Sequence, residues 1–368
     1  MKKIRTILKR IQKKVELRRK LASFVSFIKQ KEILIGISAL LTVVVIVFVV
    51  IMSTTNKPAG EVIQDIFEQE VIRHPLTGQI IDAQLDNLPQ VFGVMVENSA
   101  DAWPLSGLDQ AFLVIEAPVE GSIPRFIAFF SDDQEVEKIG PVRSARPYYI
   151  DWNDGLQAMY THVGGSPEAL ELIKNTYDTL DLNQFWYADF FYRQNSTRYA
   201  PHNVYTTVEL LKEAFDEIFD DAEVPSYDIW QFADDQPVET QSSISIDWSD
   251  GLTYDVGWKY QEETNSYLRY QGLSAMKMED GAVIKTNNIA VISTDIRVID
   301  NEGRRSIVTV GSGDALIAQN GEVYLARWEK QDHDDRLKFY TTDGYEISFN
   351  AGKTWIEVVS SLSQVEIE

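Results

Sequence analysis

The sequence predicts a mixed fold, α+β or α/β, with a single N-terminal transmembrane helix, a mixed α/β first ectodomain and a mostly antiparallel β second domain. Three observations lead to this prediction. Residues 33–52 contain no charged side chain. Short apolar runs, typical of strands, are followed by helical patterns between residues 91 and 219. After residue 243, alternating runs are separated by glycine-containing turns, which are typical of hairpins.

The N-terminal region predicts how the chain is anchored. Residues 1–32 contain twelve Lys or Arg and two Glu, although the whole chain has a net charge of −22. The apolar run 33–52 is long enough to cross a hydrocarbon core of about 30 Å as a helix. A cleavable signal peptide has a shorter apolar core, so we interpret the run as a retained membrane anchor. The Lys/Arg asymmetry then places residues 1–32 in the cytoplasm and the bulk of the chain outside the cell membrane.

The basic arm has a helical pattern of its own. Ile4, Leu8, Ile11 and Val15 recur at helical spacing among basic residues. Such a helix would contact the anionic inner leaflet. An equally weighted alternative is that the basic residues only determine which side of the membrane the N-terminus occupies. A third alternative is that the arm binds a cytoplasmic protein.

Composition excludes several classes of chemistry. The chain has no cysteine, which removes disulfides, thiol nucleophiles, zinc–thiolate sites and iron–sulfur clusters. The signatures of common hydrolases and metalloproteases are absent, so no cofactor, metal site or catalytic residue is predicted and enzyme activity stays uncertain. Acidic runs at 132–137 and 332–335 lack calcium-loop spacing and are interpreted as solvated faces. The acidic ectodomain argues against a nucleic-acid partner.

Changes in composition and in hydrophobic pattern along the chain predict its domains. We expect a stalk at 53–74, an α/β ligand-binding domain at 75–222, a linker at 223–243, a β-rich C-terminal domain at 244–360 and a tail at 361–368. The linker is acidic and contains prolines, which is typical of a domain border.

Individual elements follow from local patterns. Strands are expected at Val91–Val96, Phe112–Glu116, Phe126–Phe130 and Gln157–Val163, and helices at Pro167–Tyr177 and Thr207–Phe219. In the second domain, runs such as Glu322–Trp328 and Thr354–Val359 are expected in hairpins, with turns at Asp250-Gly251, Asn301–Gly303, Asn320-Gly321 and Asp343-Gly344. Trp355 is expected to pack inward.

The segment around His162 predicts an anion site. His162 should end a buried strand, and Ser166 and Pro167 suit the N-cap and the first position of a helix. Gly164 and Gly165 would allow a tight turn and the close approach of a ligand to free amides at the helix N-terminus. The alternative is a well-capped turn without a ligand.

Three arginines supply the expected positive charge. Arg143 and Arg146 lie in an extended or turn-like segment between Pro141 and Pro147, and Arg125 leads into a strand. Arginine is preferred where phosphate or carboxylate is held by two hydrogen bonds. The alternative is pairing within the protein, with carboxylates such as Glu97, Glu116, Glu120 or Asp151.

A third cluster, Arg198, His202 and Asn203, lies in a proline-constrained loop. It offers a cation, a titratable ring and an amide. His162 and His202 are two of the four histidines in the chain, and both fall in the first predicted domain. If they face one pocket, they would bind a ligand or transfer protons.

Several longer motifs resemble a known family. They are ProLeuThrGly (75–78), SerGlyLeuAspGln (106–110), GluAlaProValGluGly (116–121), GlyProValArgSerAlaArgPro (140–147), HisValGlyGlySerProGlu (162–168), ProHisAsnValTyrThr (201–206), TyrLeuArgTyr (267–270) and GlyLysThrTrpIle (352–356). They occur in the order found in the YerB-like family of bacterial envelope proteins, a domain of unknown function with a distinct C-terminal part. The resemblance implies a Gram-positive-type envelope protein outside the membrane. Many relatives are described as lipoproteins, but a chain without cysteine has no lipidation site of that kind, so the 33–52 helix would replace the lipid.

These observations favour a membrane-tethered binding or regulatory module. It would bind an anionic wall component or an acidic segment of an envelope protein through Arg143, Arg146, the amides of residues 164–166 and His202. A second hypothesis is an enzyme that acts on cell-wall material, with His162 or His202 as acid and base. A third is a structural scaffold in which the β-rich domain contacts other envelope proteins.

Overall fold

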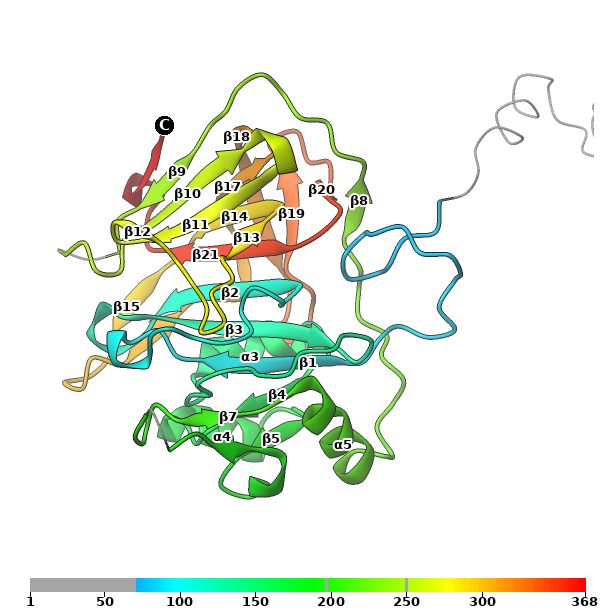
Figure 1. Ribbon diagram of the computed structural model, residues 1–368, viewed down its shortest axis with the longest axis vertical. Helices are drawn as coiled ribbons and strands as arrows, with labels where there is room; N and C mark the ends of the chain where they lie inside the picture. Colours follow the sequence, from blue (N-terminus) through cyan, green and yellow to red (C-terminus); the bar gives the residue numbers. More distant parts are fainter. Residues whose placement is uncertain (1–70, 196–197, 249–250) are drawn as a thin grey trace, which may run out of the picture. The chain divides into compact units, whose positions relative to one another are not determined.

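The computed structural model describes residues 71–195, 198–248 and 251–368 (Figure 1). The predicted basic arm and transmembrane helix, most of the predicted stalk, and Asp250 of one predicted turn lie outside the described residues. Residues Ile72–Glu368 form one compact unit. Within the described ranges, no helix has the length and apolarity that crossing a membrane would require.

A ten-stranded sheet runs through this unit (Figure 1). In sheet order its strands are β19 (Lys338–Thr341), β18 (Glu322–Lys330), β17 (Gly311–Gln319), β14 (Asn288–Ser293), β21 (Thr354–Val359), β2 (Leu113–Pro118), β3 (Pro124–Ser131), β1 (Val91–Val96), β4 (Met159–His162) and β5 (Asp181–Asn183). The strands β14, β21, β2, β1, β4 and β5 all run in one direction, because β3 is antiparallel to both β1 and β2. Their carboxyl ends therefore lie at the same edge of the sheet.

A second, antiparallel sheet belongs to the C-terminal segment. It is formed by β12 (Ser274–Ala275), β11 (Ser266–Gln271), β10 (Val256–Gln261), β9 (Ile244–Ile246) and β22 (Val365–Ile367), with β13 (Lys285–Thr286) paired to β11. Three small pairs are β15 (Ile296–Val298) with β16 (Arg305–Ile307), β20 (Ser348–Asn350) with β8 (Gln231–Ala233), and β6 (Tyr192–Arg193) with β7 (Val204–Tyr205). The α-helices of the described chain are α3 (Pro147–Asp154), α4 (Pro167–Asn175) and α5 (Val208–Ile218).

Both faces of the large sheet are buried, which explains why its central strands read as continuous apolar runs. Alternate side chains of β1 enter two different clusters: Phe92 and Val94 belong to one, and Val91 and Met95 to the other. The first cluster includes α5 and the antiparallel sheet. The second includes α3 and Trp230. The sheet is thus the middle layer of the unit.

The predicted mixed α/β fold and the mostly antiparallel C-terminal segment are confirmed. The structure corrects two details. Thr354–Val359 is a strand with Trp355 buried, as expected, but it is not part of a hairpin, since it runs parallel to both β14 and β2. Helix α3 was not predicted, because its sequence PYYIDWND is rich in aromatic residues that do not favour a helix.

Candidate functional site

The carboxyl edge of the sheet brings together most of the predicted ligand-binding residues. The segment 140–145 lies across the ends of β1 and β4 and is held by backbone hydrogen bonds. The amide of Glu97 donates to Pro141 (3.0 Å), the amide of Arg143 to Met95 (2.8 Å), and the amide of Val163 to Arg143 (3.0 Å). In open α/β sheets, ligands bind at the carboxyl ends of parallel strands, so this edge is where a site is expected.

Arg143 and His202 converge on one buried carboxylate, Glu97, which directly follows β1. Nε of Arg143 lies 3.1 Å from Oε1 of Glu97, and Nδ1 of His202 lies 2.9 Å from Oε2. The hydroxyl of Ser99 donates to Oε1 at 2.7 Å. We call these four residues the Glu97 cluster. Only 4 % of the Glu97 side chain is exposed, so the carboxylate contacts the guanidinium of Arg143 and the ring of His202 from the inside of the protein.

The outward parts of the cluster remain accessible. The side chains of Arg143 and His202 are each 23 % exposed. Among the described residues, Nε of Arg143 forms an ion pair with Glu97 but no hydrogen bond, and no hydrogen bond reaches its terminal nitrogens or Nε2 of His202. With a protonated His202 ring the cluster has one net positive charge, and with a neutral ring it has none. Its unused donors are therefore suited to an anionic group.

Arg146 and Arg125 form a second group around Glu120, at the same edge. Arg146 donates from Nε and Nη2 to the two carboxylate oxygens of Glu120, each at 2.7 Å. Burial disfavours the charged form of both side chains. The two hydrogen bonds and the attraction between the opposite charges outweigh this effect, so the pKa of Arg146 is raised and that of Glu120 is lowered. Arg125 is buried and donates to the carbonyl of Ser144 (2.9 Å), and burial together with the nearby Arg146 lowers its pKa.

The structure therefore shows internal pairing for Arg143 and Arg146, the alternative that the sequence left open. A ligand at Arg146 would have to compete with both oxygens of Glu120. Arg143 keeps unused donors, so it is the better candidate of the two.

His162 and the turn after it are built as structural features. His162 is completely buried, with Nδ1 2.7 Å from the carbonyl of Gly164 and Nε2 2.6 Å from Asp181, so it offers no surface to a ligand. Gly164 has φ +59°, and its amide donates to Asn183. Ser166 caps α4 as predicted, accepting from the amide of Ala169 at 3.3 Å. Gly165 pairs with Ala145 in a parallel bridge.

The remaining predicted residues hold loops in place. Arg198 donates to the carbonyls of Ala102 and Pro104. Asn203 is buried, accepts from Arg193 (3.0 Å) and donates to Asn195 (2.7 Å). Arg198 and Asn203 therefore help to position the loop that carries His202.

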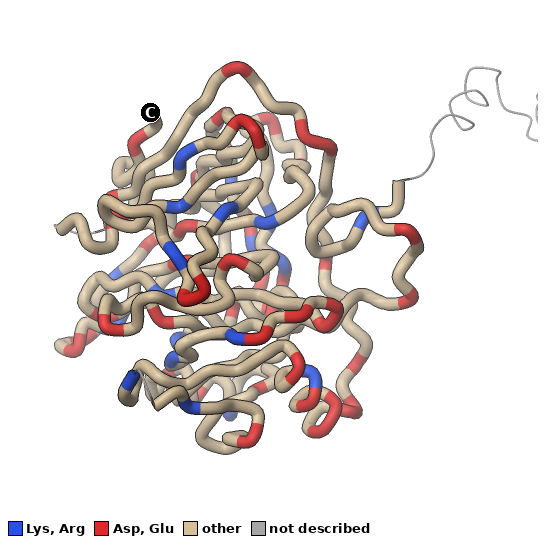
Figure 2. Tube along the Cα trace, viewed as in Figure 1, with Lys and Arg blue, Asp and Glu red and all other residues tan. Residues whose placement is uncertain are grey.

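Several hollows of the described surface are acidic, and those given below are lined by none of the predicted ligand-binding residues. Three have volumes of about 520, 540 and 660 Å³. The first is lined by Glu135, Glu137, Glu279 and Asp280, and its Lys138 is paired with Glu279. Figure 2 shows acidic positions spread over the described chain, in keeping with its net negative charge.

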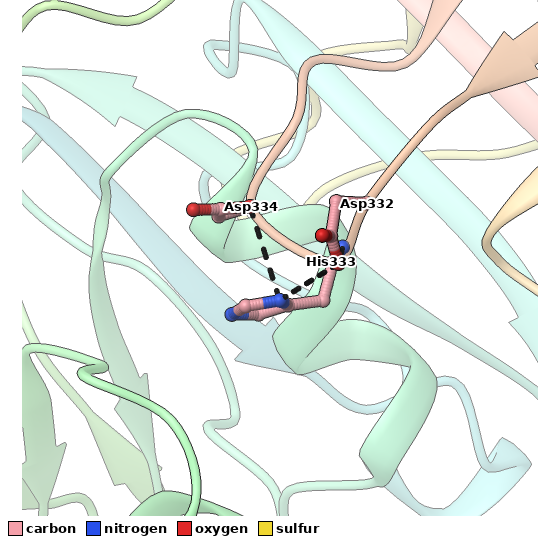
Figure 3. Close-up of side chains that lie close together, drawn as sticks. All are labelled: Asp332, His333 and Asp334. Carbon is pink, nitrogen blue, oxygen red and sulfur yellow. Dashed lines mark hydrogen bonds and ion pairs between the residues drawn. The ribbon is translucent and has the colours of Figure 1, made fainter.

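One exposed group has ligand atoms close enough to hold a metal ion: Asp332, His333 and Asp334, within 4.8 Å of one another (Figure 3). Nδ1 of His333 faces both aspartates, and its ring stacks on Tyr177 with centroids 4.2 Å apart. Hydrogen bonds from the amide and ring of His333 lower the pKa of Asp332. Since these contacts already use the aspartates, we interpret the group as a solvated turn, as the sequence predicted for 332–335.

A buried ionic group was missed by sequence reasoning. Arg269 of β11 donates to both oxygens of Glu116 in β2 (3.0 and 2.8 Å), and all three side chains of Arg269, Glu116 and Glu357 are fully buried. Trp355 donates to Glu116 and Trp258 to Glu357. Glu116, Arg269 and Trp355 lie within motifs 116–121, 267–270 and 352–356, so the motifs themselves were the available signal.

The fold defines a class: a two-segment α/β protein whose segments share one central sheet. Residues 76–219 match the N-terminal domain of "Protein of unknown function (DUF3048)", and residues 244–356 match its C-terminal domain. The chain belongs to this family.

The relatives agree with that assignment. The chain is 31 % identical to "Putative lipoprotein YerB" of Bacillus subtilis (strain 168) over 313 residues, covering 80 % of this chain and 88 % of that protein. The crystal structure of YerB from Bacillus subtilis superposes with a TM-score of 0.71 at 29 % identity, covering 81 % of this chain and 99 % of that one. The resemblance to YerB-like proteins is thus confirmed.

Proposed function

We propose that this chain is a membrane-anchored, extracytoplasmic binding protein of the bacterial cell envelope, and that its Glu97 cluster binds a phosphate or carboxylate group. The anchor would be the helix at 33–52, which takes the place of the lipid implied by the name of the Bacillus subtilis relative. Wall components and acidic segments of envelope proteins both carry such groups.

The observation that supports the proposal is the convergence of Arg143 and His202 on Glu97. The two side chains come from separate segments of the chain, 140–145 and 201–206, yet one buried carboxylate contacts both. A guanidinium that is already oriented loses less freedom on binding an anion than a mobile one does. Glu97 thus orients the donors of Arg143 and His202 for an anion, in addition to balancing the charge of Arg143.

The test measures binding of inorganic phosphate and of lactate to the full-length protein in detergent micelles, by isothermal titration. Arg143→Gln and His202→Gln should each weaken binding by about tenfold or more, since each removes a charge-assisted donor. Arg297→Gln is the matched control, because Arg297 is 75 % exposed and paired with Asp295 in another part of the fold. Equal affinities for wild type and all three variants would refute the proposal.

A second candidate, an enzyme that acts on wall material, is favoured by one observation. Glu97 contacts Nδ1 of His202 and leaves Nε2 directed away, the arrangement in which a carboxylate orients a general base. Because His162 is buried with both nitrogens engaged, His202 is the acid or base that this hypothesis requires. Turnover of wall fragments, followed by mass spectrometry and lost in His202→Gln, would support it over simple binding.

A further inference from the structure

Arg336 is a buried cation without a polar partner among the described residues. It is 8 % exposed. Its Nε is fully enclosed and forms no hydrogen bond. Its guanidinium stacks on the ring of Trp230, 4.0 Å from the centroid. Arg269, which is also buried, is by contrast paired with both oxygens of Glu116.

An unpaired buried guanidinium is unfavourable, because the protein returns little of the hydration that the charge loses. Stacking on Trp230 recovers part of this, but it satisfies none of the N–H donors. Desolvation lowers the pKa of Arg336 to about 9, so the side chain stays charged at neutral pH. A guanidinium with an enclosed Nε and no protein partner needs an explanation, and a ligand at its other nitrogens supplies one.

Arg336 lines a hollow of about 230 Å³ at the β19 end of the large sheet. Of the three guanidinium nitrogens, only Nε is without solvent access. The hollow is also lined by Asp228, Glu329, Gln331, Asp335, Lys338 and Tyr340. Lys338 is taken by Asp228, at 2.5 Å. Arg336 is therefore the cation that is left for a ligand there.

The loop that carries Arg336 is held on both sides. Nζ of the buried Lys330 donates to the carbonyls of His333 (2.6 Å) and Asp335 (2.5 Å). On the other side, the indole of Trp230 donates to the carbonyl of Leu337 (2.8 Å). Because these bonds fix the backbone before and after Arg336, the position of the guanidinium is built into the fold.

The charges around the hollow indicate the class of ligand. Arg336 suits a carboxylate, which it can bind through two parallel hydrogen bonds. Glu329 and Asp335 have no ion-pair partner among the described residues, and they would repel a polyanion but attract an ammonium group. A ligand with one group of each sign satisfies both requirements.

We propose that this hollow binds a small zwitterion with an amino-acid head group, its carboxylate on Arg336 and its ammonium facing Glu329 and Asp335. The site lies at the opposite end of the sheet order from the Glu97 cluster, so the two proposals stand independently.

The test compares glycine and D-alanine with acetate, ethylamine and inorganic phosphate as ligands of the full-length protein in detergent, by isothermal titration and by thermal unfolding. We expect glycine or D-alanine to bind at least about tenfold more tightly than acetate or ethylamine, since only a zwitterion makes both contacts. Acetate or phosphate binding as tightly as glycine, and lost in Arg336→Met but kept in Arg143→Gln, would overturn the zwitterion assignment, because such binding lies in this hollow and not at the Glu97 cluster. Absence of any glycine or alanine binding would overturn the site.

Two variants separate a ligand-binding role from a structural one. Arg336→Met should abolish amino-acid binding and leave the unliganded protein equally or more thermally stable, because it removes an uncompensated buried charge. Glu329→Gln should weaken binding of the amino acid but not of acetate. If Arg336→Met lowers the melting temperature while wild type binds no amino acid, Arg336 is only a packing residue. Arg297→Met is the surface control.

Discussion

Glu116 and Glu357 lie opposite each other in the register of β2 and β21, and both are fully buried beside one cation, Arg269. Two carboxylates facing a single guanidinium leave one negative charge in excess, and the low dielectric makes that costly. Burial and the neighbouring Glu116 raise the pKa of Glu357 well above its usual range. The pair therefore retains one proton, which we place on Glu357.

This proton predicts how stability depends on pH. Because the folded-state pKa of Glu357 is raised, its contribution is complete below the unfolded pKa and declines as pH rises from about 4.3 towards the folded value. Glu357→Gln mimics the protonated form, so it should match wild type at pH 4 and exceed it at pH 7. The measurement is the free energy of unfolding by urea at both values.

The matched control removes both acids. Glu116→Gln with Glu357→Gln leaves Arg269 buried without a carboxylate, and the expected loss is about 3–5 kcal/mol at pH 7. A loss of that size for Glu357→Gln alone would show instead that Glu357 is ionised in the folded protein.

The partners of the arginines are what the sequence could not predict at the scale of residues. The sequence offered Glu97, Glu116, Glu120 and Asp151 as partners for the arginines, without a way to choose. Arg143 reaches Glu97 because the segment 140–145 crosses the end of β1, and Arg146 reaches Glu120 because that residue follows β2. The choice thus depends on strand order, which residue types alone do not specify.

At the scale of elements, local patterns predicted strands better than their partners. Val91–Val96 and Thr354–Val359 begin and end where the sequence indicated. The pairing of Thr354–Val359 was wrong because the glycine-containing turn before it, Asp343-Gly344, resembles a hairpin turn, whereas its real partners, β2 and β14, are distant in sequence. Local signals carry no information about such pairings.

The turn between β4 and α4 gives a prediction at this scale. A Cβ on Gly164 would lie 2.6 Å from the ring of Phe185, at a φ of +59°. Gly164→Ala should destabilise the protein by about 1–2 kcal/mol from backbone strain and should also displace Phe185. The amides of Gly164 and Phe185 share the acceptor Asn183 Oδ1, so both should exchange with deuterium faster.

Gly281→Ala separates strain from contact. Gly281 has φ +91°, but a Cβ there would meet nothing within 4 Å. Gly281→Ala should lose a similar amount of stability from backbone strain, but it should not affect deuterium exchange at the amides of Gly164 or Phe185. Faster exchange at Phe185 in both variants would show that general destabilisation, rather than the contact, is responsible.

At the scale of the whole described unit, the two segments are joined through polar contacts as well as strands. Next to Glu97, the side chain of Asn98 accepts from Gln271 (3.1 Å), and Gln271 accepts in turn from Arg269 (2.8 Å). The Glu97 cluster is thus connected to the buried ionic group between the two sheets. The second sheet supports the candidate site even though it supplies none of the four residues of the Glu97 cluster.

The shared sheet leads to the last prediction. The division into domains at 223–243 remains a prediction from sequence, but β21 of the second segment is hydrogen-bonded to β2 of the first, and Trp355 packs edge-on against Phe126 at 5.5 Å. A chain that ends at Ser243 would expose the β2 edge and leave Glu116 without Arg269. We expect this truncated chain to show no cooperative thermal transition and to bind a hydrophobic dye, whereas the full chain unfolds in one step by circular dichroism and tryptophan fluorescence. A cooperative transition in the truncated chain would show that the first segment folds independently and that the β21 strand only docks onto it.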